Sequence, residues 1–380
     1  MFPRSLKRLQ VVLNHAKMCS AGMAIGNHND VIHQVINKTA IIILNRPQAL
    51  NSLNYSMVKK IHPQIRAWEA DSDVQLLIMK GSGEKAFCAG GDIVALTQNH
   101  KKDGKYGVTF FADEYKLDYA LGTYSKPYVA VIDGVTMGGG VGLSVHGRFR
   151  VATERTLFAM PETAIGLVPD VGGGYFLPRL QGKLGMYLAL TGYRLKGRDV
   201  QLAGIATHYI PSNMITEMEE TLVGLDQPSI KNVTEVLDSF HKESTTEQHD
   251  FILKSEMDKI NRVFSGTSLE QIFENLEKDG SEWALKELNK LKRMSPTSMK
   301  LTFRQITEGG HLSLEDVFLM ENRLTQRCME DHDFYEGVRA LLVEKDLKPQ
   351  WKPDTLEGVT QEKVDWYFSK LPNGREMTLP

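Results

Sequence analysis

Cysteine is scarce in this 380-residue chain, whose three cysteines, Cys19, Cys88 and Cys328, lie far apart in the sequence. Their spacing matches no zinc site, and an odd number of cysteines argues against a disulfide framework. We therefore expect a protein of a reducing compartment, without structural disulfides.

The chain also lacks a long apolar run and an excess of charge of one sign. No stretch of the sequence approaches the roughly 18–20 apolar residues that a membrane-spanning helix needs. The 45 Lys and Arg residues nearly balance the 47 Asp and Glu residues, for a formal net charge of −2. The overall charge therefore does not favour binding to nucleic acid or to an anionic membrane surface.

Acidic residues are missing from the N-terminus, where the first one is Asp30. Four basic residues precede it, and apolar residues recur at helical spacing between positions 6 and 13. A basic, acid-free amphipathic segment is typical of a mitochondrial transit peptide. We expect residues 1–29 to direct the protein to the mitochondrial matrix; the alternative is a basic tail without a targeting role.

Between residues 30 and 215, short apolar runs alternate with amphipathic stretches. Residues 40–44, 74–80 and 128–132 predict buried strands. Residues 56–70 predict a helix, because apolar side chains recur there every three or four positions. The alternation favours an α/β core over residues 30–215.

From about residue 210 onward, charged helical patterns replace the β-branched runs. Ser295 followed by proline predicts an N-cap and the first helical position of one helix. Val317, Met320 and Leu324 follow the spacing of the buried face of another. The sequence therefore predicts a helical region over residues 216–380.

Two glycine-rich segments, Lys85–Asp92 and Gly134–Gly142, carry the strongest chemical signal. Two backbone N–H groups can point at one developing oxyanion only where no side chain blocks the approach, and glycine permits this. Neither a dinucleotide-binding nor a P-loop pattern fits, and His146 stands where a serine nucleophile elbow needs its second glycine. We predict an oxyanion site that uses the Gly139 N–H; the alternative is a pair of tight turns.

Two carboxylates follow these segments. Glu162 comes directly after a proline, and Asp170 lies between a proline and the run Gly172–Gly174. One acid able to act as base or nucleophile, with a second to orient it or handle protons, would suit acyl transfer. The alternative is that both are ordinary surface acids or helix caps, and the residues by themselves leave this open.

Together with the segment Leu44–Asn51, these motifs resemble the crotonase, or enoyl-CoA hydratase/isomerase, superfamily, and they occur in the same order. The resemblance covers about residues 31–215. It implies an α/β fold, a crotonase-like spiral of ββα repeats with a largely helical C-terminal region. It also implies that an acyl-CoA thioester oxygen binds between the N–H groups of Gly91 and Gly139.

The chain departs from the hydratases of this superfamily at two positions. Gly142 stands where they carry a first catalytic glutamate, whereas Glu162 matches the second one. Asp170 stands where they usually have a small residue. Loss of one acid of the pair makes water addition to a double bond a poor match.

Five further segments extend the resemblance over nearly all of the chain after the basic leader: residues 158–162, 169–180, 191–197, 294–298 and 333–340. With them the chain most resembles the branch of the superfamily that hydrolyses short branched β-hydroxyacyl-CoA thioesters. This resemblance implies hydrolysis of 3-hydroxyisobutyryl-CoA, a step of valine catabolism. Glu162 and Asp170 would be catalytic, and Glu114, Gly139, Glu162 and Asp170 would contact the substrate. From the sequence, the alternative for Glu114 is a charge on a helix surface.

The resemblance implies no metal and no redox cofactor, since CoA is part of the substrate. It also suggests a homo-oligomer; the alternative is that the helical C-terminal half covers the same surfaces within one chain. The balanced charge and the lack of a long apolar run predict no nucleic-acid partner and no membrane span. Two other functions stay open at this point: an enoyl- or dienoyl-CoA isomerase of the same fold, and a non-catalytic binding protein. Release of free thiol separates hydrolysis from isomerisation, which frees no CoA.

Overall fold

The computed structural model describes residues 29–372 and 374–380, and the chain from Val31 onward forms one compact unit. The expected transit peptide lies outside the described residues, apart from Asn29. Of the helices formed by the described residues, none is long and apolar enough to cross a bilayer.

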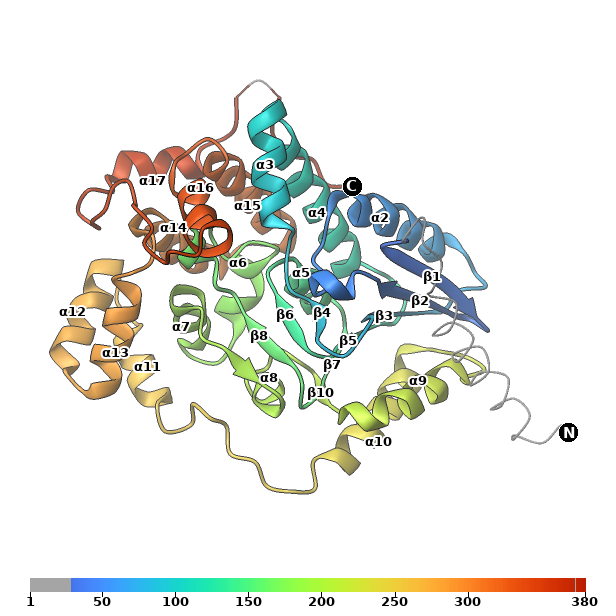
Figure 1. Cartoon of the computed structure of the whole chain (residues 1–380). Coiled ribbons are helices and arrows are strands. Elements are labelled where there is room, and N and C mark those ends of the chain that lie inside the picture. The colour runs from blue at the N-terminus through green and yellow to red at the C-terminus, as the bar shows by residue number, and fades with distance from the viewer. Residues whose placement is uncertain (1–28, 373) are drawn as a thin grey trace, which may run out of the picture. The chain divides into compact units, whose positions relative to one another are not determined.

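Two β-sheets frame the N-terminal half of this unit (Figure 1). The strands of the larger sheet, in the order in which they pair, are β1 Val31–Ile36, β2 Thr39–Leu44, β3 Leu76–Gly81, β5 Tyr128–Ile132, β7 Phe149–Ala152 and β10 His208–Tyr209. Those of the smaller sheet are β4 Ala86–Cys88, β6 Val135–Met137, β8 Leu157–Ala159 and β9 Leu195–Lys196. Only the end pairs β1–β2 and β8–β9 are antiparallel among these ladders.

The chain winds through the two sheets as a spiral. Three times it adds a strand to the larger sheet, then one to the smaller sheet, and then turns into helical structure. The helical segments are α3 Ile93–Asp103 and α4 Tyr106–Gly122 after β4, α5 Gly139–Val145 after β6, and the 3-10 turn η2 Glu162–Ile165 after β8. This is the predicted spiral of ββα repeats.

The spiral places three distant segments at one edge of the smaller sheet. β4, β6 and β8 are parallel neighbours, so their carboxyl ends lie together. Gly90 and Gly91 follow β4, Gly138 and Gly139 follow β6, and Glu162 follows β8. Loops at the carboxyl ends of parallel strands are the usual place for ligand sites in α/β proteins.

The helix predicted at residues 56–70 is α2 Tyr55–Ala70, with Asn54 as N-cap accepting from the N–H of Met57. The short helix α5 begins at Gly139, and Gly138 is its N-cap. Gly138 has a φ of +45°, which a side chain would disfavour, so the residue before the helix must be the glycine that turns the chain.

The C-terminal region is helical, as predicted. Three short helices precede it: α6 Gly173–Phe176, α7 Leu184–Thr191 and α8 Arg198–Leu202. The helices of the region itself are α9 Ile215–Val223, α10 Ile230–Ser244, α11 Met257–Val263, α12 Leu269–Asp279, α13 Glu282–Leu291, α14 Pro296–Gly309, α15 Leu314–Cys328, α16 Asp333–Val338 and α17 Gln361–Phe368. The N-cap predicted at Ser295 is present, and its hydroxyl accepts from the N–H of Ser298.

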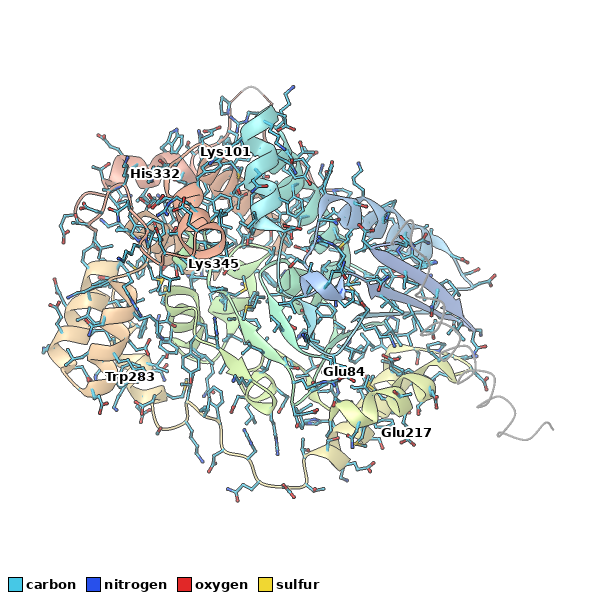
Figure 2. All side chains as sticks on the ribbon, in the orientation of Figure 1. Glu84, Lys101, Glu217, Trp283, His332 and Lys345 are labelled. Atoms are coloured by element: carbon cyan, nitrogen blue, oxygen red, sulfur yellow. The ribbon has the colours of Figure 1, made fainter. Side chains whose placement is uncertain are left out.

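These helices cover different parts of the core. α9 and α10 pack on one face of the larger sheet through a separate apolar cluster, whereas α14, α15 and α16 pack around the turns near Glu162 and Gly174 (Figure 1). α16 also meets α3, where the Lys101 ammonium lies 5.1 Å from the ring centroid of Tyr335. Figure 2 labels Lys101 on α3 and His332 just before α16. The helical region therefore borders the edge of the smaller sheet.

Candidate active site

Two backbone N–H groups lie unpaired at this edge. Leu53 pairs with Gly91 in a parallel bridge, in which Leu53 donates to the Gly90 carbonyl and accepts from the N–H of Asp92, both at 2.8 Å. The Gly91 N–H therefore points away from Leu53. Gly139 is the first residue of α5, so its N–H has no acceptor inside the helix. Within the described part of the chain, neither N–H donates a backbone hydrogen bond.

The two glycine segments are in contact, and two carboxyl groups flank them. A methyl group added to Gly139 would lie 3.5 Å from the Gly91 nitrogen and would overlap the Oε1 atom of Glu114. One added to Gly138 would lie 3.2 Å from the Oε1 atom of Glu162. The structure thus brings together Gly91, Gly139, Glu114 and Glu162, the arrangement that the resemblance implies.

Glu162 is the first residue of η2, directly after Pro161, and Gly166 ends the turn in the left-handed conformation. Its side chain is buried, and its Oε2 atom has no hydrogen-bond partner among the described residues. Burial, and secondarily the charge of Asp170, raises the pKa of Glu162 well above its usual value. A carboxyl group with a raised pKa is a stronger base when ionised.

Asp170 is also buried, and the Tyr115 hydroxyl donates to its Oδ2 atom at 2.6 Å. Burial raises the pKa of Asp170 to about 6, although the Tyr115 hydrogen bond lowers it. Asp170 is therefore largely ionised at neutral pH. Its charge also acts on Glu162 and Glu114, since it raises the pKa of both.

Glu114 and a second acid, Asp118, lie one turn apart on α4 and face α5. Glu114 faces Gly139, and a methyl group on Gly142 would overlap the Oδ2 atom of Asp118 and lie 2.7 Å from Val171 Cβ. Both acids are buried, and burial is the main reason why the pKa of each is raised. The alternative that Glu114 is a surface charge is therefore wrong.

Asp118 was not predicted from the sequence. The available signal was its spacing of four residues from Glu114, which places both on one face of a helix. The structure gives Gly142 a packing reason: any side chain there would displace Asp118. The carboxyl group next to this part of α5 comes from α4 instead.

Apolar side chains surround Gly91 and Gly139 on the sides that the carboxyl groups leave open. A methyl group on Gly91 would lie 3.2 Å from Ile93 and 3.7 Å from the Phe110 ring, and one on Gly139 would lie 3.5 Å from Leu53. Low polarity on these sides strengthens hydrogen bonds from the two N–H groups. The arrangement can hold one oxyanion next to carboxyl groups in a mostly apolar setting.

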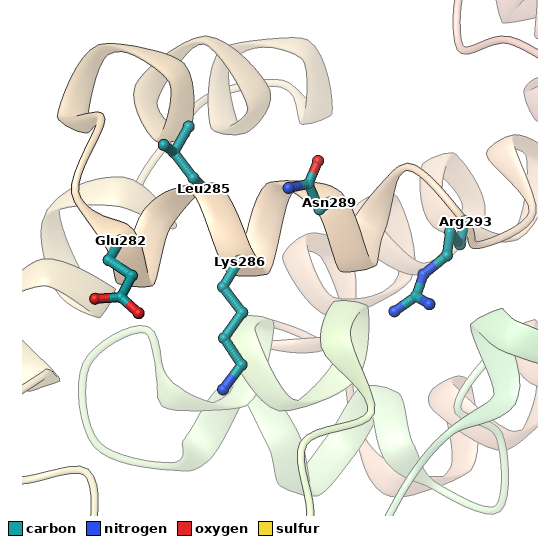
Figure 3. Close-up of a pocket in the computed structure, with 5 residues that line it drawn as sticks. All are labelled: Glu282, Leu285, Lys286, Asn289 and Arg293. Carbon is teal, nitrogen blue, oxygen red and sulfur yellow. The ribbon is translucent and has the colours of Figure 1, made fainter.

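A surface hollow of about 830 Å³ elsewhere in the protein contains none of these acids. Its lining comes from one helix, α13, and the turn after it, and consists of Glu282, Leu285, Lys286, Asn289 and Arg293 (Figure 3). It offers no buried acid and no glycine N–H. The hollow therefore lacks the groups that the edge of the smaller sheet brings together.

The ββα spiral defines the class of the protein, an α/β fold that sets two glycine segments side by side at the edge of its smaller sheet. Residues 39–368 match the family described as enoyl-CoA hydratase/isomerase, and the chain belongs to that family.

Several relatives that match nearly the whole chain are named "3-hydroxyisobutyryl-CoA hydrolase, mitochondrial". The relative from Danio rerio is 55% identical, over 97% of this chain and 95% of its own length. The one from Homo sapiens is 52% identical, over 97% of this chain and 95% of its own length.

Solved structures confirm the fold. A carnitinyl-CoA dehydratase from Mycobacterium thermoresistibile is 36% identical with a TM-score of 0.84, and the match covers 92% of this chain and 99% of that one. An enoyl-CoA hydratase from Rhodobacter sphaeroides is 33% identical with a TM-score of 0.83, over 92% and 100% of the two chains.

Proposed function

We propose that the protein hydrolyses the thioester of 3-hydroxyisobutyryl-CoA, and of related short β-hydroxyacyl-CoAs, to the hydroxy acid and CoA in valine catabolism. Relatives 52–56% identical over nearly the whole chain are named for this activity. The observation in this structure that carries the proposal is the set of buried carboxyl groups beside the glycine pair. Gly142 has no room for a hydratase glutamate, whereas Glu162 and Asp170 remain.

In this proposal the N–H groups of Gly91 and Gly139 hold the thioester oxygen. Negative charge develops on that oxygen when the carbonyl carbon becomes tetrahedral, and two aligned donors stabilise it. Since neither N–H group donates to a backbone carbonyl of the described residues, no backbone hydrogen bond among them must break before the substrate binds.

Glu162 is the group that we assign to the attack. In one route its carboxylate adds to the carbonyl carbon, the C–S bond breaks, and the CoA thiolate takes up a proton. Water then hydrolyses the mixed anhydride and restores the carboxylate. In the other route Glu162 removes a proton from a water molecule that attacks the same carbon.

A single turnover in ¹⁸O-water identifies the anhydride route if the label enters Glu162. If Glu162 is the nucleophile, water attacking the Glu162 side of the anhydride leaves the label in the enzyme, at Glu162. If Glu162 is a base, the label appears in the hydroxy acid alone.

Asp170 and Glu114 complete the proposed site. Asp170, ionised and held by Tyr115, would orient the water or the hydroxyacyl group and assist proton transfer. Glu114, with its raised pKa, is suited to donate a hydrogen bond to a substrate hydroxyl or carbonyl group. The sequence of steps needs no metal and no redox cofactor, and CoA takes part as half of the substrate.

We also propose that the protein acts in the mitochondrial matrix and forms a homo-oligomer. The word mitochondrial in the names of the relatives and the acid-free basic leader support the location. Light scattering coupled to gel filtration measures the oligomeric state directly.

The test of the activity is a panel of short acyl-CoA thioesters assayed for free thiol. We expect 3-hydroxyisobutyryl-CoA to release thiol faster than isobutyryl-CoA, its match without the hydroxyl group. Crotonyl-CoA is the control for hydration, the activity named for the enoyl-CoA hydratase structure. Loss of enoyl absorbance without thiol release would contradict the hydrolase proposal.

A further inference from the structure

The turn that follows Asp170 has an unusual backbone. Val171 has a φ of +52° and Gly172 a φ of +82°. A β-branched residue in the left-handed region is a steric outlier, and such conformations persist only where the surroundings hold them. The strained residue is the direct neighbour of the acid that we place in the site.

Side chains from three different helices hold this turn. The Tyr115 hydroxyl on α4 donates to Asp170 at 2.6 Å. The Nε2 atom of His146, the C-cap of α5, donates to the Val171 carbonyl at 2.8 Å. Glu321 on α15 accepts from the N–H groups of Gly172 and Gly174. These contacts come from segments far apart in the sequence.

Glu321 accepts two hydrogen bonds from the backbone of the turn. Its Oε2 atom accepts from the Gly172 N–H at 2.7 Å, and its Oε1 atom accepts from the Gly174 N–H at 2.8 Å. Gln305 donates to the same Oε1 atom at 2.8 Å and to the Pro169 carbonyl, also at 2.8 Å. Glu321 is completely buried, so no water competes for these donors.

We propose that Glu321 is a positioning residue of the hydrolytic site, which holds the Asp170–Gly174 turn in its strained conformation and so keeps Asp170 buried beside Glu162. This inference rests on the proposed function. Glu321 does not touch the reacting atoms and acts through the backbone of the turn.

A glutamate suits this position better than its amide. A carboxyl group can accept from both glycine N–H groups with its two oxygens, whereas a glutamine offers one acceptor oxygen and turns an NH₂ group toward the other N–H. The variant Glu321→Gln therefore leaves at least one of the two N–H groups unsatisfied and releases that end of the turn.

A released turn exposes Asp170 to water, and this exposure should change the pKa of Asp170 in a direction that can be measured. Burial is the main cause that raises the pKa of Asp170 to about 6, so a more exposed Asp170 titrates at lower pH. The titratable groups that interact electrostatically with Asp170 are Glu114, Tyr115 and Asp118 on α4, Glu162 on η2, and Glu321 and Cys328 on α15. His146, the C-cap of α5, contacts the next residue, Val171, through its carbonyl.

The experiment compares the full-length wild type with Glu321→Gln, and with Glu315→Gln as a matched control on the exposed face of α15. Thiol release from 3-hydroxyisobutyryl-CoA is measured from pH 4.5 to 9 below the melting temperature of each variant. For Glu321→Gln we expect kcat to fall by about 10²-fold, the scale of a small misplacement of a catalytic group. We expect the acid limb of the kcat profile to move to lower pH, while Glu315→Gln matches the wild type.

The result that overturns the inference is a folded Glu321→Gln protein with the kcat and acid limb of the wild type. If that variant does not fold, Glu321→Asp replaces it, because the shorter side chain keeps a carboxyl group but cannot reach both N–H groups. A wild-type kcat and profile for Glu321→Asp would overturn the inference in the same way. A wild type that releases no thiol refutes the proposed function instead, so the two failures are distinguishable.

Discussion

At the scale of single residues, the site is a group of acids taken out of water. Glu114, Asp118, Glu162 and Asp170 are each at most 5% exposed, and burial is the first cause of the raised pKa of every one of them. Ionised carboxyl groups are costly to bury, so the protein gives up stability to hold them there. Such a cost is common at catalytic sites.

Glu162→Gln tests the proposed attacking group. The amide has nearly the same shape but can neither attack nor take up a proton, so we expect kcat to fall by at least about 10²-fold with the fold intact. Thiol release gives kcat, and circular dichroism checks the fold. Near-normal turnover by the folded variant would remove Glu162 from the mechanism.

Asp170→Asn tests the cost of the buried charge. Because its pKa is raised from 3.8 to about 6, Asp170 contributes stability that is complete below its unfolded pKa and is lost as pH rises through about 6. The neutral amide escapes this loss, which is on the order of 2–3 kcal/mol at pH 7.5. We expect the variant to melt at a higher temperature than the wild type at pH 7.5 and to show a smaller difference at pH 4.5.

Although Asp170→Asn should raise the melting temperature, it should lower the rate of thiol release, since it removes the charge that assists proton transfer. Melting curves at the two pH values and thiol release at pH 7.5 measure both effects. Equal melting temperatures at pH 7.5 would mean that the charge of Asp170 is well solvated in the folded protein.

At the scale of elements, the contact between α4 and α5 decides which side chains the site can contain. Acids on α4 face glycines on α5: Glu114 faces Gly139, and Asp118 faces Gly142. The glycines on α5 leave space for the acidic side chains of α4. A larger side chain on α5 should therefore displace an acid on α4.

Gly139→Ala places a methyl group against Glu114 and next to the Gly91 nitrogen. Alanine keeps the backbone N–H, but its methyl group forces Glu114 or the loop to shift and so misaligns the donor. We expect kcat to fall by up to roughly 10²–10³-fold, the scale for loss of one oxyanion donor. Gly310→Ala is the matched control, because a methyl group there meets only ordinary contacts of 3.5 Å or more. Equal activities of the two variants would mean that the thioester oxygen is held elsewhere.

Gly142→Glu restores the hydratase glutamate in sequence but finds no room in the structure. Its side chain would displace Asp118, so we expect loss of stability and of thioester hydrolysis rather than a gain of hydration. Adding Asp118→Gly vacates the space and should recover part of the melting temperature. If the double variant is no more stable than Gly142→Glu, the two positions do not compete.

At the scale of the whole molecule, the C-terminal helices are part of the site's support. Glu321 on α15 binds the turn after Asp170. The Thr163 carbonyl, next to Glu162, accepts from the N–H of Ser295 at the start of α14. The chain from Val31 to Pro380 accordingly packs as one unit, and the helical region positions the chemistry of the α/β core.

Deleting residues 1–29 should leave thiol release unchanged, because every group assigned to the site lies after Asp30. The same deletion should abolish uptake by isolated mitochondria if the basic leader is a transit peptide. Protease protection of the imported protein measures uptake, with the full-length chain as the control. A deleted protein that still reaches the matrix would contradict the targeting prediction.

The sequence by itself determined the local elements and the family. The strand predicted at residues 40–44 is β2, and the helix predicted at residues 56–70 is α2, because apolar periodicity is a local property of the chain. The glycine motifs and Glu162 could also be selected, since a close backbone approach and a carboxylate after proline are visible in the sequence. Their assignment to one catalytic site stays a prediction.

Only the tertiary structure decided which of these residues meet. The parallel order of β4, β6 and β8 brings the two glycine turns and Glu162 to one edge, and no local pattern encodes that order. Glu321 lies on the apolar face that Val317, Met320 and Leu324 define, and an acid on such a face is visible in the sequence as an exception to the pattern. Its role depends on glycine N–H groups about 150 positions earlier. Burial and hydrogen bonding of an acid come from contacts distant in the chain, which only the folded protein supplies.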